Sequence, residues 1–124
     1  MKRFILIAGL LALAATTSPV KKQADGTVTI NTTTLKADEG CFGPTPVIIH
    51  LDAQERVSKI EALPNGETPS YWSLVMEKLS TVWNGLPATE AASLEVDAVT
   101  GATYSSEGLI SNVRSGLIYY LQSK

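Results

Sequence analysis

The sequence is short of the residues that build disulfides and metal sites. Its 124 residues include one cysteine, Cys41, and one histidine, His50. A single cysteine cannot form a disulfide within the chain, and one cysteine with one histidine gives no metal-ligand spacing. Because a lone cysteine is most often a small buried side chain, we expect Cys41 to be buried; a redox thiol or an intermolecular disulfide is the alternative.

The chain also lacks an excess of basic residues. Ten Lys and Arg side chains stand against twelve Asp and Glu side chains, which gives a formal net charge of −2. Proteins that bind nucleic acid carry basic patches, often interleaved with aromatic residues, and no such patch is present in this sequence. The composition therefore argues against nucleic acid as a partner.

Long apolar runs are scarce, and the one that stands out extends from residue 4 to residue 15. Lys2 and Arg3 precede it, and small residues end it. A positive start, a short apolar core and a small-residue end are typical of a secretory signal peptide, and the run is shorter than the roughly 20 residues of a membrane span. We therefore expect a signal peptide over residues 1–15 and export of the protein, with an uncleaved anchor as the alternative.

The remaining residues have room for one domain. Residues 18–25 are polar and residues 26–35 are rich in β-branched side chains, so we expect residues 16–39 to be a linker with a possible edge strand. Residues 40–124 are expected to form the domain itself.

A β-hairpin over residues 45–62 is the clearest structural prediction. Two apolar stretches, 46–51 and 56–62, flank a polar turn. Val57 and Ile60 are three positions apart, so in a regular strand their side chains would point to opposite faces of the sheet. This indicates a bulge or an exposed apolar end. His50 lies within the first strand, and we expect it to be partly buried with one hydrogen bond, because the sequence places no carboxylate or cysteine to orient it for catalysis.

Two longer helices are expected after the hairpin. Apolar residues recur at three- and four-residue steps over 70–84, where Ser70 is a candidate cap, and over 105–122, where Ser105 or Ser106 is a candidate cap. Residues 87–93 are expected to form a short helical turn or loop. The sequence thus predicts an α+β domain in which a small antiparallel sheet, based on the hairpin, is packed by two helices.

Three aromatic residues, Tyr71, Trp72 and Trp83, lie in the first of these helices. Aromatic side chains on an amphipathic helix usually belong to the core, which is the interpretation we favour here. A site for a planar ligand is the alternative.

The stretch Val96–Ser106 carries the candidate chemistry. Thr103 follows Gly101 and Ala102 and lies just before the predicted last helix. A helix N-terminus offers unpaired N–H groups and partial positive charge, which together bind phosphate. A threonine hydroxyl placed there can bind a phosphate or be esterified to one, although a Ser/Thr-rich turn into a helix is common without either role.

Residues 97–103, with the sequence Asp-Ala-Val-Thr-Gly-Ala-Thr, resemble the flavinylation motif of the FMN-binding domain family. This domain is found in the sodium-pumping NADH:quinone reductase and in the Rnf complex. The resemblance extends loosely over residues 40–122. It implies an exported electron-transfer protein in which Thr103 carries FMN through a phosphodiester bond made by an FAD-dependent flavin transferase.

The resemblance also assigns roles to other positions of the motif. It implies that Thr100, Gly101, Ala102 and Ser105 shape the phosphate-binding loop. Asp97 matches the acidic position that the transferase recognises, and its alternative role is to bind backbone N–H groups in a turn.

A second match to the family lies at Glu67-Thr68-Pro69. In the family this tripeptide follows the second strand and lies near the flavin, so Glu67 and Thr68 are expected to contact FMN. Relatives commonly have glycine after the proline, whereas this chain has Ser70 and so departs from the family's pattern at this loop.

Two other functions stay open at this point. One is a domain that binds FMN without a covalent bond, as a flavin reductase module. The other is a cofactor-free adaptor domain of an exported complex. The expected partners of the covalent flavoprotein are the transferase and membrane or extracytoplasmic redox proteins.

Overall fold

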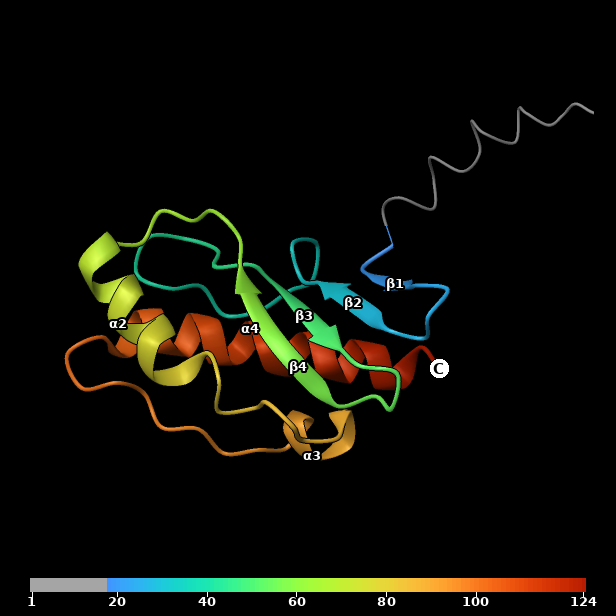
Figure 1. Cartoon of the computed structure of the whole chain (residues 1–124). Helices are drawn as coiled ribbons and strands as arrows, with labels where there is room; N and C mark the ends of the chain where they lie inside the picture. The colour runs from blue at the N-terminus through green and yellow to red at the C-terminus, as the bar shows by residue number, and fades with distance from the viewer. Residues whose placement is uncertain (1–17) are drawn as a thin grey trace, which may run out of the picture.

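The computed structural model describes residues 18–124, so the predicted signal peptide lies outside the described residues. The elements are, in order, β1 (Val20–Lys22), β2 (Val28–Asn31), β3 (Val47–Leu51), β4 (Val57–Ala62), α2 (Pro69–Leu79), α3 (Ala88–Ala92) and α4 (Thr103–Gln122). The strands form one antiparallel sheet in the order β1-β2-β3-β4, and α4 runs beneath it (Figure 1). The predicted α+β fold is confirmed.

The predicted hairpin is formed by β3 and β4. Ile49 pairs with Ile60 and His50 with Lys59, but Leu51 pairs with Val57, so the register shifts between His50 and Leu51. This shift is the predicted bulge: because of the extra residue, Val57 and Ile60 both face the core and are buried.

The range 16–39, expected to be a linker with a possible edge strand, contains two strands: β2 lies inside the sheet, between β1 and β3, and the edge strand is β1. Residues 20–22 form β1, which pairs with β2 from Val20↔Ile30 to Lys22↔Val28. Polar side chains suit this strand because it lies at the edge of the sheet, where short and charged strands discourage pairing with other chains.

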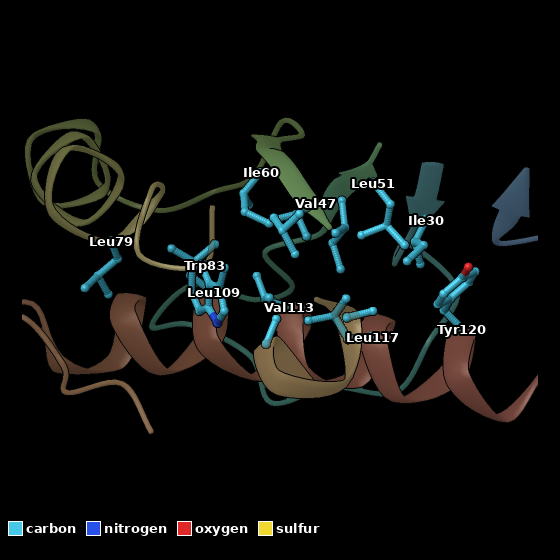
Figure 2. Close-up of a cluster of buried hydrophobic side chains, with 14 of the residues drawn as sticks. Ile30, Val47, Leu51, Ile60, Leu79, Trp83, Leu109, Val113, Leu117 and Tyr120 are labelled. Carbon is cyan, nitrogen blue, oxygen red and sulfur yellow. The ribbon is translucent and has the colours of Figure 1, made fainter. Parts of the chain in front are cut away.

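The core lies between the sheet and α4. Leu109, Val113 and Leu117 are buried and project from α4 toward the sheet, where they meet Val47 and Leu51 (Figure 2). Their spacing of four residues keeps them on one face of the helix. α2 and α3 also contact α4, so α4 is the element on which the other helices pack.

The opposite face of the sheet carries the alternate residues of each strand, and these are mostly polar. His50 is one of them: its Nε2 lies 2.9 Å from Oε1 of Glu61. The single predicted hydrogen-bond partner of this partly buried histidine is therefore found.

α2 differs from the predicted helix at both ends. It begins at Pro69, whose fixed φ suits the first helical position, and Thr68 precedes it without a side-chain cap, so the predicted Ser70 cap is wrong. The helix ends at Leu79 instead of residue 84, and the turns that follow bury Trp83, which is 2 % exposed. Trp83 is thus a core residue, as favoured, but it lies outside the helix.

Within residues 18–124, no helix combines the length and the apolar character needed to cross a membrane.

Candidate functional site

The candidate motif leads into the N-terminus of α4. Residues 94–99 have no regular secondary structure, and the chain then turns at Gly101, whose φ of +88° is a conformation that glycine adopts without strain. The N–H of Ala102 donates to the carbonyl of Val99, 2.9 Å away. We expected Thr103 to lie just before the helix. The helix begins at Thr103 itself, so this residue occupies the first helical position.

Neither Ser105 nor Ser106 caps the helix, so that prediction is wrong. Both hydroxyls lie inside the first turn and are buried. Ser106 Oγ donates to the carbonyl of Ala102 and accepts from the N–H of Val99, at 2.7 and 2.9 Å. Ser106 therefore fixes the loop of the motif against the helix instead of occupying its free N–H groups.

The first turn of α4 is consequently free to bind an anion. No side chain caps the helix, and the N–H groups of Thr103, Tyr104 and Ser105 donate no hydrogen bond within residues 18–124. Thr103 is exposed, as are Thr100 and Gly101 before it, whereas Ala102 is buried beneath the turn. Uncapped N–H groups at the positive end of a 20-residue helix are the arrangement that holds phosphate.

Glu67 connects this turn to a second loop. Its carboxylate is only 5 % exposed. Oε1 accepts from Ser105 Oγ at 2.5 Å and from the N–H of Cys41 at 3.0 Å, and Oε2 accepts from the N–H of Phe42 at 2.7 Å. The expectation that Glu67 contacts a cofactor stays a prediction, but the structure shows that both of its oxygens bind groups of the chain itself.

Burial and hydrogen bonding act on Glu67 in opposite directions. Burial raises the pKa of this carboxyl, but the hydrogen bonds from Ser105, Phe42 and Cys41 outweigh it and hold the pKa below its ordinary value. Glu67 is therefore ionised at neutral pH.

Three exposed aromatic side chains lie close in the chain to Glu67 or to its hydrogen-bond partners. Phe42 donates its N–H to this carboxylate, Tyr104 stands between Thr103 and Ser105, and Tyr71 lies in the first turn of α2. They are 62 %, 67 % and 52 % exposed. The core assignment of Tyr71 is therefore wrong, and Phe42 and Tyr104 were missed by the sequence analysis, although Tyr104 directly follows the motif.

The other predicted residues lie at the edges of this site. Asp97 is exposed, and its carboxylate accepts no hydrogen bond from residues 18–124, so the alternative turn-binding role is not seen. Thr68 is half-buried at the start of α2. Cys41 is exposed beside Phe42, so the expectation that it is buried is wrong.

Among the described residues, no group of three His, Cys, Asp or Glu side chains is placed to hold a metal ion. His50 also takes no part in the site, because its partner Glu61 lies with it on the outer face of the sheet.

Comparison with known proteins identifies the domain. The family model described as the FMN-binding domain matches residues 40–118. A search of curated proteins finds no match to the chain. The matched range contains Glu67, the candidate motif and most of α4, so the uncapped turn at Thr103 lies inside it. The chain belongs to the FMN-binding domain family.

Proposed function

We propose that this protein is an exported electron-transfer protein that carries FMN in phosphodiester linkage to Thr103. One observation carries the proposal: in a chain of the FMN-binding family, an exposed threonine hydroxyl lies at the first position of an uncapped helix. The hydroxyl and the N–H groups that would bind a phosphate are thus presented on the same turn.

The residues present fit the phosphate of FMN. The free N–H groups of Thr103, Tyr104 and Ser105 provide donors, and the helix dipole favours an anion at this end. Gly101 turns the chain in a left-handed conformation that glycine adopts without strain, and the space around it is open, since a Cβ built on it would meet nothing within 4 Å. When bound, the isoalloxazine ring supplies one- or two-electron chemistry, and the protein supplies its position and environment.

Attachment requires a partner enzyme, because a threonine hydroxyl is a weak nucleophile at neutral pH. In the proposed reaction, Oγ of Thr103 attacks the phosphorus on the FMN side of FAD. The bond to the bridging oxygen of the pyrophosphate breaks, AMP leaves, and the hydroxyl proton goes to a base of the transferase. The exposed carboxylate of Asp97 is available for recognition by that enzyme.

Covalent attachment suits an exported carrier, because a dissociable cofactor would be lost by dilution outside the cell.

The exposed rings of Phe42, Tyr71 and Tyr104 offer flat apolar surface. We assign them to contact with the isoalloxazine ring or with an extracytoplasmic redox partner, which exchanges electrons at this end of the domain.

The test is the intact mass of the protein co-expressed with a flavin transferase. We expect the mass to increase by that of FMN minus one water, and in-gel flavin fluorescence to accompany it. Thr103→Ala should lose both signals completely. Thr89→Ala, which changes an exposed threonine at the start of α3, is the matched control and should be modified like the unaltered chain.

Other outcomes would assign other functions. An unmodified mass, with a transferase that is active on another substrate, would overturn the covalent linkage. Flavin that is then removed by dialysis would indicate a non-covalent FMN module. A protein that binds no flavin in titration would indicate an adaptor domain.

A further inference from the structure

We propose that Glu67 is a positioning residue for Thr103: its buried carboxylate joins the loop of residues 40–43 to the first turn of α4 and so fixes the threonine in the arrangement that the transferase modifies. In this role Glu67 does not touch the flavin. The effect on modification rests on the function proposed above, whereas the connection between the two segments does not.

The hydrogen bonds of Glu67 support a role within the protein. Two donors come from consecutive backbone N–H groups, those of Cys41 and Phe42, and one comes from the Ser105 hydroxyl. Glu67 is 5 % exposed, so little of its surface is left for a ligand, and three of the roughly four acceptor sites of its carboxylate are taken by groups of the chain. Hydrogen bonds to a charged acceptor are about twice as strong as neutral ones, so these bonds hold the two segments together firmly.

Close packing around the carboxylate limits its movement. A Cβ added at Gly40 would lie 2.6 Å from Oε1 of Glu67. A Cβ added at Gly108, on α4, would lie 2.6 Å from Oγ1 of Thr45 and 2.9 Å from the N of Gly40. The two glycines therefore allow the loop to lie directly against the helix, and the carboxylate of Glu67 is hydrogen-bonded to both segments.

The connection reaches Thr103 through one turn of helix. Ser105, which donates to Glu67, is two residues after Thr103 in the first turn of α4. The side-chain bonds of Ser106 stay within residues 99–106, so among the described residues the bond from Ser105 to Glu67 is the side-chain hydrogen bond that ties this first turn to a distant segment. Without Glu67, Phe42, on the other side of the carboxylate, would lose the bond that fixes its backbone.

The first experiment measures amide hydrogen exchange in the unmodified protein and needs no flavin. Glu67→Gln replaces one acceptor oxygen by an NH2 group, which must face a donor. We expect the N–H groups of Cys41 and Phe42 to exchange at least about tenfold faster, with a smaller change at Ile49 in the centre of the sheet. Val28→Ala, which removes core packing at the far end of β2, is the control and should leave Cys41 and Phe42 protected.

The second experiment measures the rate of FMN transfer under single-turnover conditions, well below the melting temperature of each variant. We expect Glu67→Gln to reduce this rate about tenfold or more, since small misplacements of a reacting group are costly. Ser105→Ala and Gly40→Ala should also reduce the rate of FMN transfer. These two variants keep the test valid if Glu67→Gln does not fold. Val28→Ala should transfer at the normal rate, although it melts at a lower temperature.

The outcomes separate the two proposals. A normal transfer rate in Glu67→Gln and Ser105→Ala, or an equal loss in Val28→Ala, would overturn the positioning role. Unchanged exchange at Cys41 and Phe42 would overturn the connection itself. If the unaltered chain accepts no FMN at all, the proposed function fails, and the exchange experiment alone decides whether Glu67 joins the two segments.

Discussion

At the scale of single residues, two glycines have the same backbone conformation in different surroundings. Gly85 has φ +86° and Gly101 has φ +88°, and a Cβ at either position would meet nothing within 4 Å. Their substitution by alanine therefore has the same local cost, which comes from the left-handed conformation and not from a clash. Only Gly101 lies in the candidate site.

This pair separates stability from function. We expect Gly85→Ala and Gly101→Ala each to lower the free energy of unfolding by about 1 kcal/mol, measured by urea denaturation. FMN transfer should fall in Gly101→Ala and stay normal in Gly85→Ala. Equal transfer rates in the two variants would show that the conformation of Gly101 has no part in modification.

Individual residues also show what the sequence could and could not predict. The turn at Gly101 and a helix directly after it were predictable because the motif, the glycine and the helix start are adjacent in the chain, although α4 begins at Thr103 and not at residue 105. The roles of Ser105 and Ser106 were not, because a serine near a helix start has the same local signal whether it caps the helix or lies in its first turn. Glu67, 38 residues away, decides the role of Ser105.

At the scale of elements, α4 is attached to the sheet by polar as well as apolar contacts. Asn112 is buried on α4; its Oδ1 accepts from Thr32 Oγ1 at 2.8 Å, and its Nδ2 donates to the carbonyl of Gly108 at 2.9 Å and to Thr45 Oγ1 at 3.3 Å. Thr32 in turn accepts from the N–H of Val47. This network orients the helix against the chain on either side of the long connection between β2 and β3.

Because these groups are buried, removing one of them leaves partners without hydrogen bonds. We expect Asn112→Ala to lower the free energy of unfolding by about 2–3 kcal/mol, measured by urea denaturation monitored by tryptophan fluorescence. Asn84→Ala, at an exposed position of the turn after α2, is the control and should change it by less than about 0.5 kcal/mol. A loss below that limit in Asn112→Ala would mean that the network does not stabilise the fold.

The elements themselves were predicted better than their ends. Alternation and helical periodicity located β3, β4, α2 and α4, since each buries one face against the same core. α2 ends at Leu79, before the predicted residue 84, and the turns that follow bury Trp83 in the core, which periodicity in the sequence could not separate from a longer helix. β1 was missed because it is an edge strand that pairs with β2 alone. Its side chains are largely exposed and polar, so its sequence has no alternation of apolar residues that could be detected.

At the scale of the whole molecule, the charges predict how stability depends on pH. Glu55, Glu61 and Glu67 all have a pKa below the ordinary value of 4.5 in the folded protein. For Glu55 the first cause is the hydrogen bond from Lys124, and for Glu61 it is the bond from His50; Glu67 is held low by three donors despite its burial. A lowered folded pKa means that the unfolded chain binds protons first as the pH falls.

We therefore expect these carboxyls to make their full contribution to stability above about pH 5, and stability to fall as the pH drops below 4.5, through their folded pKa values. The measurement is the urea midpoint at a series of pH values. Glu67→Gln should reduce the steepness of this fall, whereas Glu77→Gln, an exposed change on α2, should leave it as it is. An identical pH profile for Glu67→Gln would show that this carboxyl is not held ionised.

The bonds of Glu67 join residues that are 25, 26 and 38 positions apart. Such contacts close long loops, which costs more entropy than pairing segments that are close in the chain. The motif of residues 97–103 is complete as soon as the chain has been made, whereas the arranged turn exists only after these loops have closed. An enzyme that recognises the arrangement would ignore the nascent or misfolded chain, and the bound flavin would then mark only those molecules that have completed folding.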